Sequence, residues 1–446
     1  MRIWTATMNV TISPHALSGT IPSIASKSVA HRILILAALC PTDAEIACST
    51  TSVDIDATIR CLNALGAAIT PTEGGYHVAP IPAVEERTSP RGNIGRTLEC
   101  EESGSTLRFL LPVVAALGCG AHFTGHGRLA KRPLSPLYEL LQQGGCSLSP
   151  QGTFPLDLSG KLQSHEFILS GNVSSQFVTG LLMAASVMDG PVKIVVAEPI
   201  QSRPYIDITL KAMADFGIKI MSTPVLHGDK ACVEYTVTPT HTPLTSPGLL
   251  TVEGDWSNAA FWLSAGAIGT DSVCVTNMNL SSVQGDRYCL AALALFGARI
   301  NRAPGQVSVS HGTLSPVKID VHDIPDLVPV LAVVAAYAQG ETRFTHAERL
   351  RLKESDRLES TADLIRAMGG EVATTDSALT IVGHGGLHGG GPVDAANDHR
   401  IAMAAAIAAT CAEEPTKILG AECVSKSYPS FFEDFQALGG LVKKEV

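Results

Sequence analysis

The chain has 446 residues, 45% of them hydrophobic and 17% charged, against roughly 25% charged in an average soluble domain. This composition excludes a disordered or coiled-coil chain, and a net charge of −10 argues against a nucleic-acid-binding surface. Eleven cysteines lie scattered without a CxxC pair, so we expect reduced, buried thiols and no disulfide or zinc framework.

The longest clean apolar stretches, such as residues 330–338, are much shorter than the ~20 residues that span a membrane. The N-terminal residues MRIWTATMNVTISPHALSG contain no continuous apolar region of the kind found in signal peptides. We therefore expect a cytoplasmic protein without a transmembrane helix.

A pattern of the form L-x-x-φ-G, followed by a β-like stretch, recurs along the whole chain. A helix commonly stops in this way on a left-handed glycine. Successive copies lie between 70 and 80 residues apart, which indicates six internal repeats. The glycines are Gly66, Gly145, Gly217, Gly297, Gly370 and Gly440.

Each repeat also carries an earlier helix that begins with polar capping residues and then becomes apolar on nearly all sides. Such a helix is buried rather than half exposed. With the β-branched runs between the helices, one repeat is predicted to consist of strand, buried helix, strand, exposed helix, strand and strand. The predicted buried helices are 26–39, 103–117, 174–187, 255–268, 325–338 and 397–409.

Six repeats of this size need neighbours, so we predict an α/β fold of two lobes with three repeats each. The Pro-rich segment 238–248 is the predicted linker between the third and fourth repeats. The last repeat lacks strands after Gly440, and the strand-like MNVTIS at 8–13 is expected to supply one. Lobe one is therefore predicted to contain 1–24 and 247–446, and lobe two 25–246.

The starts of the buried helices are predicted anion sites, because unpaired N–H groups there carry partial positive charge. Lys27 and Ser28 begin the first helix, with Arg32 one turn beyond on the same face. The second helix has Arg108 three residues after Ser105. A single such pattern is usually just a capped helix, but similar polar starts recur in four repeats.

Ten short segments stand out along the chain: ASKSVAHR, SGSTLRF, TGHGRLAKRP, SSQF, SRPYIDIT, EGDWS, IPD, LKESDRL, NDHR and SKSYP. In order and spacing they resemble the 5-enolpyruvylshikimate-3-phosphate (EPSP) synthase family of the shikimate pathway. The resemblance covers essentially the whole chain and implies a two-lobed inverse α/β barrel of six βαβαββ units, with the active site in the cleft between the lobes. It implies transfer of the enolpyruvyl group of phosphoenolpyruvate to the 5-hydroxyl of shikimate 3-phosphate, without a metal or other cofactor.

The resemblance also implies which residues bind the two anionic substrates. Arginine forks and helix starts suit carboxylates and phosphates. The shikimate 3-phosphate residues implied are Lys27, Ser28, Arg32, Ser174, Ser175, Gln176, Ser202, Asp326 and Lys353, with Arg203 and Tyr205 near the phosphate. The phosphoenolpyruvate residues implied are Lys27, Gly104, Arg128, Gln176, Arg357, Arg400 and Lys426.

The reaction needs a base for the attacking hydroxyl and an acid for the methylene carbon. The resemblance implies Asp326 and Glu354 for these roles, in either order, with Lys27 as a third catalytic residue and His399 as a functional histidine. From the residues alone, Asp326 is more typical of a helix cap. By the same reasoning, Glu354 is more typical of a surface pair with Arg357 or Arg351.

Some expectations concern features outside this site. The glycine-rich segment 383–391 fits no phosphate-loop pattern and is predicted to be a hairpin or loop tip. Histidine spacings argue against a metal. Glu102 stands where many family members have Asn, so binding of the family's inhibitor glyphosate is left open. We expect a monomer that binds small molecules only, with no nucleic acid or membrane partner.

Three alternatives remain at this point. The related enolpyruvyl transferases that act on UDP-N-acetylglucosamine have Lys-Asn where this chain has Lys27-Ser28, and a loop cysteine that TGHGRLAKRP lacks. A phosphometabolite-binding protein without turnover would not need both carboxylates. An RNA 3′-phosphate cyclase of a repeat fold would favour a basic face.

Overall fold

The structure is a computed structural model that describes residues 8–82, 95–238 and 246–445. Its contacts divide the chain into two compact units. Unit 1 contains Met1–Ile24 and Glu253–Val446, and unit 2 contains Ala25–Val252. The Pro-rich segment predicted as a linker lies mostly outside the described residues, as does Trp4.

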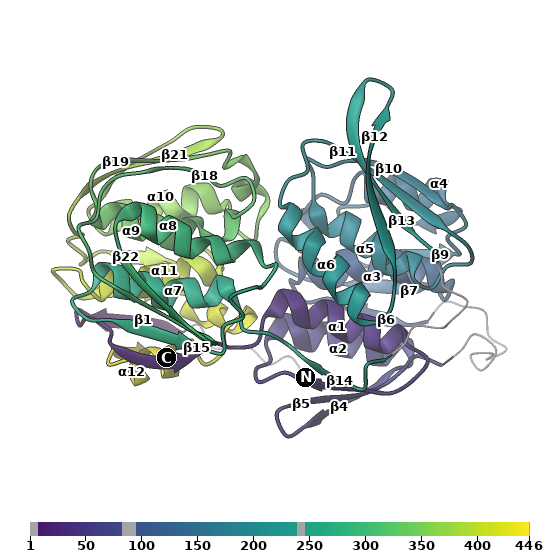
Figure 1. The fold of residues 1–446 in the computed structure, drawn as a ribbon, viewed down its shortest axis with the longest axis horizontal. Helices are drawn as coiled ribbons and strands as arrows, with labels where there is room; N and C mark the ends of the chain where they lie inside the picture. Colours follow the sequence, from purple (N-terminus) through teal and green to yellow (C-terminus); the bar gives the residue numbers. More distant parts are fainter. Residues whose placement is uncertain (1–7, 83–94, 239–245, 446) are drawn as a thin grey trace. The chain divides into compact units, whose positions relative to one another are not determined.

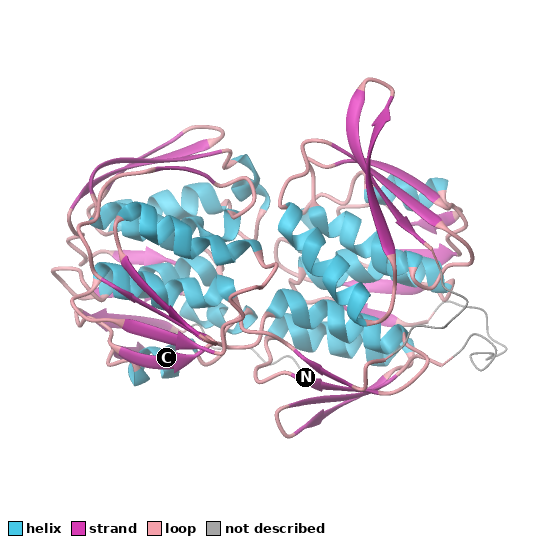
Figure 2. Ribbon diagram, in the orientation of Figure 1, coloured by secondary structure: helices cyan, strands magenta, loops and turns pink. Residues whose placement is uncertain are grey.

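Six four-stranded sheets, three in each unit, carry the repeat. In every sheet one edge strand pairs in parallel with its neighbour and the other neighbouring strands pair antiparallel, as in β10-β11-β13-β12. Figure 2 shows the helices inside each unit and the strands toward the outside. The predicted two-lobed α/β fold of six repeats is thereby confirmed.

Unit 2 holds the first three repeats. Its buried helices are α1 (Lys27–Leu39), α3 (Gly104–Leu117) and α5 (Ser175–Ala185), and its outer helices are α2 (Val53–Leu65), α4 (Leu137–Gln143) and α6 (Arg203–Asp215). The sheets are β14 (Leu249–Thr251), β3 (Ala44–Ala47), β5 (Gly75–Ala79) and β4 (Ala68–Thr72); β6 (Thr97–Glu99), β7 (Ala121–Thr124), β9 (Leu156–Gly160) and β8 (Cys146–Leu148); and β10 (Glu166–Ser170), β11 (Val192–Ala197), β13 (Lys230–Val237) and β12 (Ile220–His227).

Unit 1 holds the other three repeats. Its buried helices are α7 (Trp256–Ile268), α9 (Val328–Tyr337) and α11 (His399–Ala409), and its outer helices are α8 (Cys289–Phe296), α10 (Arg357–Ala367) and α12 (Phe431–Ala437). The sheets are β16 (Arg299–Ala303), β17 (Gln306–Ser310), β15 (Val273–Thr276) and β2 (Gly19–Pro22); β18 (Lys318–Asp320), β19 (Gln339–Thr345), β21 (Ala378–His384) and β20 (Glu371–Thr374); and β22 (Pro392–Asp394), β23 (Thr416–Leu419), β1 (Asn9–Ser13) and β24 (Leu441–Glu445).

Short 3-10 turns join some of these elements. They are η2 (Leu129–Lys131), η3 (Gly285–Tyr288), η4 (Pro325–Leu327), η5 (Glu348–Leu352) and η6 (Ala421–Lys426). Turn η4 precedes α9, so the residue at the start of that helix is Leu327, without a side-chain cap. The prediction that all six buried helices begin with a polar cap is therefore wrong for α9.

Three strands pair with sheets far away in sequence. Strand β1 lies between β23 and β24, and Figure 1 shows it in purple among the last strands of the chain. Strand β2, which the sequence analysis did not single out, pairs with β15. Strand β14 pairs with β3 of unit 2, so the units divide after Val252 rather than at the expected 246/247 boundary.

The helix-ending glycines follow the expected pattern in four repeats, where Gly66, Gly145, Gly217 and Gly297 have φ between +77° and +113°. In the last two repeats, the left-handed residue is instead the preceding glycine, Gly369 or Gly439. Gly370 and Gly440 have another role, close packing. A Cβ at Gly370 would lie 2.6 Å from Ile365 Cγ2, and one at Gly440 would lie 2.1 Å from the Phe435 ring.

The remaining global expectations concern cysteines, membranes and the glycine-rich segment. All eleven cysteines are free thiols, eight of them buried. In the described residues, the helices are all too short or too polar to cross a bilayer. Residues 385–391 form a loop between β21 and β22, which is one of the two predicted forms.

Candidate active site

Asp326 of η4 is surrounded by three cationic side chains of unit 1. Its Oδ1 lies 3.1 Å from Lys353 Nζ and 2.7 Å from Arg357 Nη1, and its Oδ2 lies 3.5 Å from Arg400 Nη2. The carboxylate is therefore bound by cations that α10, α11 and the end of η5 supply. The interpretation of Asp326 as a simple helix cap is wrong, because Leu327 occupies the cap position.

Arg357, whose side chain is 2% exposed, forms ion pairs with both Asp326 and Asp398. Its Nε donates to Asp398 Oδ2 at 2.8 Å and its Nη2 to Asp398 Oδ1 at 3.2 Å. Burial acts to lower the pKa of Arg357, but Asp398, Asp326 and Glu354 outweigh it and raise that pKa. Burial likewise acts to raise the pKa of Asp398, and Arg357 outweighs it so that the pKa is lowered. Both groups therefore stay charged at neutral pH.

Glu354 lies between η5 and α10, with its side chain 20% exposed. Its Oε2 is 2.8 Å from Nδ1 of the buried His399 and 3.9 Å from Arg357 Nη2. Arg351 instead pairs with Asp356 at 3.0 Å and with Glu359 at 3.1 Å. Glu354 therefore does pair with Arg357, as the alternative expected, but Arg357 is buried, so the pair does not lie on an exposed helix surface.

Lys353 is a cation that can exchange its proton near neutral pH. Burial lowers the pKa of its ammonium to about 8, with Arg357 and Arg349 acting in the same direction and Asp326 opposing them. A lysine with this pKa is suited to proton transfer as well as to binding an anion.

The other predicted cations of unit 1, Arg400 and Lys426, lie near Asp326 and the start of α11. Arg400 follows the N-cap of α11, and its Nη1 donates to the Asp326 carbonyl at 3.3 Å. Lys426, at the end of η6, donates to the Asn397 carbonyl at 2.8 Å. Asn397 and Ala396 both have left-handed backbones, with φ of 54° and 51°. All seven predicted unit 1 residues, His399 included, thus lie near the starts of α9, α10 and α11.

Three of these groups offer atoms that a metal ion could use. Ligand atoms of Glu354, Asp398 and His399 lie within 4.8 Å of one another. However, the two oxygens of Asp398 already accept hydrogen bonds from Arg357 and from Ser355 Oγ at 3.0 Å. A cation would have to displace a buried arginine, so the donor set does not fit a metal.

In unit 2, the first two turns of α1 carry two cations with different partners. Lys27 Nζ is 2.8 Å from Asp54 Oδ2 of α2. Among the described residues, Arg32, 2% exposed, donates only to neutral oxygens, including Thr209 Oγ1 at 2.8 Å and the Ser28 carbonyl at 2.6 Å. Burial lowers the pKa of Arg32 to about 9, an effect that Tyr205 partly offsets.

The starts of α3 and α5 are joined by side-chain hydrogen bonds. Arg108 Nη1 donates to Gln176 Oε1 at 2.8 Å, and Gln176 Nε2 donates to Ser105 Oγ at 3.1 Å. Arg132 lies against Gly104, where an added Cβ would be 2.4 Å from the Arg132 Nη1 atom. The sequence analysis did not select Arg132, although it lies in the segment TGHGRLAKRP that supplied Arg128.

The other residues implied in unit 2 lie at helix starts or turns. Ser174 caps α5, its hydroxyl accepting from Gln176 N at 3.3 Å, and Ser175 follows it, 4% exposed. Ser202 precedes α6 with a left-handed φ of 55°. Arg128 is exposed before η2, and Gly104 has Arg132 rather than Arg128 against it.

Glu102, which departs from the family pattern, packs on the loop before Arg128. A Cβ at Gly127, whose φ is +61°, would overlap the Glu102 carboxylate. The glycine at 127 is therefore needed both for its backbone and for this contact.

Six four-stranded sheets in two units of three form the same fold as solved structures of an enolpyruvyl transferase and of EPSP synthase. The enolpyruvyl transferase NikO from Streptomyces tendae is similar in fold, with a TM-score of 0.75 and 18% identity over 98% of this chain and 99% of NikO. EPSP synthase from Acinetobacter baumannii has a TM-score of 0.79 and 24% identity, over 99% of this chain and 100% of that one.

Sequence comparison identifies the family. The model of EPSP synthase (3-phosphoshikimate 1-carboxyvinyltransferase) matches residues 12–435. The 3-phosphoshikimate 1-carboxyvinyltransferases of Clostridium beijerinckii and Clostridium kluyveri are each 38% identical, covering 97% of this chain and 98% and 97% of the relatives. The chain belongs to the EPSP synthase family.

Proposed function

We propose that the chain transfers the enolpyruvyl group of phosphoenolpyruvate to the 5-hydroxyl of shikimate 3-phosphate, releasing phosphate, in the synthesis of aromatic amino acids. Family membership supports this reaction. The observation that carries it is the pair of carboxylates in unit 1: Asp326 is held by three cations, and Glu354 lies beside the buried His399.

Unit 2 supplies the groups proposed for shikimate 3-phosphate. The hydroxyls of Ser174, Ser175 and Ser202 are at helix starts, where backbone N–H groups favour a phosphate. Arg32 uses four of the five N–H groups of its guanidinium in protein hydrogen bonds, which leaves one for the substrate carboxylate. Gln176 is already oriented by Arg108, so it is suited to contact the ring.

Phosphoenolpyruvate is assigned to cations of both units. Those in unit 1 are Arg357, Arg400 and Lys426, and those in unit 2 are Lys27 and Arg128, with the backbone of Gly104. The contact between Arg132 and Gly104 supports adding Arg132 to this set. Charge-assisted hydrogen bonds of this kind are roughly twice as strong as neutral ones.

Asp326 and Glu354 are proposed to exchange the two protons of the reaction. One takes the proton of the attacking 5-hydroxyl, and the other gives a proton to the methylene carbon as the tetrahedral adduct forms. Lys353, with its pKa of about 8, supports either proton transfer, Lys353 and Lys426 support phosphate departure, and Lys27 is the third proposed catalytic residue. As phosphate leaves, the new methyl group returns one proton to the carboxylate that gave it. The proposal further includes a cytoplasmic monomer that uses no metal or other cofactor.

The test measures phosphate release with shikimate 3-phosphate and, separately, with UDP-N-acetylglucosamine as acceptor. We expect turnover with the first only, and turnover with the second alone would overturn the proposal. Glu354→Gln and Asp326→Asn should lose about 10²- to 10⁴-fold in turnover while binding substrate within about tenfold of the unchanged protein.

Melting temperatures of the same variants provide the control. If Glu354 formed only an exposed pair, Glu354→Gln would lose about 0 to 1 kcal/mol of stability and turn over normally. Near-normal turnover in Glu354→Gln would remove that residue from the mechanism.

A further inference from the structure

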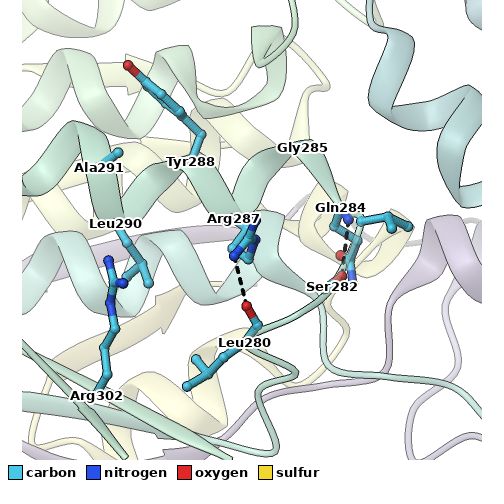
Figure 3. Close-up of a pocket in the computed structure, with 10 residues that line it drawn as sticks. Leu280, Ser282, Gln284, Gly285, Arg287, Tyr288, Leu290, Ala291 and Arg302 are labelled. Atoms are coloured by element: carbon cyan, nitrogen blue, oxygen red, sulfur yellow. Dashed lines mark hydrogen bonds between the residues drawn. The ribbon is translucent and has the colours of Figure 1, made fainter.

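A hollow of about 370 Å³ in unit 1 contains none of the residues assigned to enolpyruvyl transfer. It is lined by the segment around η3, by one side of α8 and by Arg302 of β16 (Figure 3). Its volume is at the small end of the range of ligand pockets, about 300 to 1,000 Å³. The hollow therefore has room for a small molecule.

Two arginines lie on different sides of this hollow, and no acidic residue lines it. Arg287 is held in place by a hydrogen bond from its Nη1 to the Leu280 carbonyl at 2.8 Å, drawn in Figure 3. Within the described residues, neither Arg287 nor Arg302 forms an ion pair. In a chain with a net charge of −10, two such arginines at one hollow favour an anion.

The carboxylate nearest to Arg287 in sequence, that of Asp286, is bonded to a residue outside the hollow. Its side chain is 3% exposed and bonds to the Ser257 hydroxyl at the start of α7. Burial raises the pKa of Asp286 to about 7, with Asp326 adding to the effect and Arg400 opposing it. Within the described residues, Asp286 is bonded to Ser257 and forms no ion pair with Arg287.

The rest of the wall is apolar and includes exposed hydrophobic side chains. Val283 is 41% exposed and Tyr288 is 42% exposed, and Leu280 and Leu290 also line the hollow. Exposed apolar groups beside a few polar anchors are typical of sites for small organic ligands. A bare phosphate ion would leave this surface uncovered.

We propose that the hollow is a second binding site, for a small organic anion with a flat apolar body. Its carboxylate or phosphate lies between Arg287 and Arg302, and its apolar part covers Leu280 and Tyr288. This ligand is neither substrate of the enolpyruvyl transfer, and the site does not depend on that reaction.

The position of the hollow connects it with one of the two chain crossings between the units. Its wall residues Ser282 and Gln284 both donate to Oε1 of Glu253, the first residue of unit 1 after the chain leaves unit 2, the Gln284 bond being 2.7 Å. Gln284 Oε1 also accepts from Trp256 N at 3.1 Å. A ligand bound in the hollow would therefore contact the residues, Ser282 and Gln284, that hydrogen-bond to Glu253 at this crossing.

The experiment titrates the full chain calorimetrically with phenyl phosphate, benzoate and inorganic phosphate. Three variants are compared with the unchanged protein: Arg302→Gln removes one anchor, Ala291→Trp fills the hollow without changing charge, and Arg299→Gln removes an exposed arginine of the same strand that does not line it. Binding at the active site is common to all four proteins and cancels in the comparison.

We expect the unchanged protein and Arg299→Gln to bind one phenyl phosphate more than Ala291→Trp. Arg302→Gln should bind that extra molecule about 10- to 100-fold more weakly, as the loss of a charge-assisted bond predicts. Benzoate should bind at the same place if a carboxylate suffices, and inorganic phosphate should bind more weakly because it lacks the apolar body.

Two results would overturn the proposal. One is equal stoichiometry in the unchanged protein and in Ala291→Trp, and the other is unchanged affinity in Arg302→Gln. Melting temperature and turnover of every variant, expected to match the unchanged protein, show that the chain still folds. If Ala291→Trp fails to fold, Arg302→Gln against Arg299→Gln decides alone.

Discussion

Two buried arginines, Arg32 in unit 2 and Arg357 in unit 1, differ in the charge of the groups that bind them. Arg32 of unit 2 donates only to neutral hydroxyl and carbonyl oxygens, and its pKa is lowered to about 9, mainly by burial. Arg357 of unit 1 contacts three carboxylates, which raise its pKa despite burial. Arg32 therefore keeps a positive charge that an anionic ligand can neutralise, whereas the charge of Arg357 is already balanced by carboxylates, and Arg357 acts to lower the pKa of Asp398.

In the proposed function, this difference corresponds to shikimate 3-phosphate binding in unit 2 and proton transfer in unit 1. A site that must attract a multiply charged anion benefits from a cation held by dipoles alone. A site that must move protons needs carboxylates whose charge and orientation are set in advance. Unit 2 has the first arrangement and unit 1 the second.

The largest expected effect is on stability. Arg357→Met leaves buried carboxylates without their cation, which typically costs about 3 to 5 kcal/mol, while Arg32→Met leaves only neutral groups unpaired, at about 1 to 3 kcal/mol. Denaturant unfolding followed by tryptophan fluorescence reports unit 1, where Trp256 and Trp262 are buried in α7, and circular dichroism follows the helices of both units. Equal losses in the two variants would contradict the comparison.

A smaller effect concerns the neutral acceptors of Arg32. Thr209→Val keeps the shape of the side chain but removes the oxygen that accepts from Arg32 Nε, at a cost of about 1.5 to 3 kcal/mol. Thr209→Ser keeps that oxygen and is the matched control. Circular dichroism should show earlier unfolding for Thr209→Val than for Thr209→Ser, with weaker shikimate 3-phosphate binding. Identical behaviour would mean that Arg32 does not depend on this bond.

The smallest effect is a pH dependence in unit 1. The folded-state pKa of Lys353, about 8, lies below the ~10.4 of an unfolded lysine, so the unfolded chain binds more protons between these values. Burying the charged Lys353 therefore lowers the free energy of unfolding by its full amount below pH 8, and this loss becomes smaller as the pH rises. Relative to Lys353→Met, the unchanged protein should gain up to about 1 kcal/mol of stability between pH 8 and pH 9. A constant difference across this window would show that the ammonium is not perturbed.

The sequence predicted the repeat well because its signals are local. Apolar helices and helix-ending glycines depend on residues a few positions apart, and both recur at a fixed period. The exact glycine is less predictable, as Gly369 and Gly439 show, because either residue of a Gly-Gly pair can take the left-handed backbone. Strands β2 and β14 have only four and three residues, and their partners lie more than 200 residues away in sequence.

Site residues could be predicted from the sequence where they belong to a motif. Residues that reach the site only through the packing of the folded chain could not. Motifs selected Asp326, Glu354 and Arg357, and the structure brings these together. The contact of Arg132 with Gly104 could not be predicted from the sequence. Arg128 and Arg132 lie in the same segment, and only the backbone path of η2 between them determines which one lies against Gly104. The binding and catalytic roles of the residues in both units remain predictions.

The placement of β1 in the last sheet bears on how the protein is made. Unit 2 ends at Val252 and has all its strands once that residue has been synthesised. Strands β1 and β2 are made first, yet their partners β23, β24 and β15 appear much later. On a ribosome that adds about 5 to 20 residues each second, β1 and β2 wait many seconds for their partner strands while unit 2 can already fold. Strand β24, Leu441–Glu445, completes the sheet to which β1 belongs.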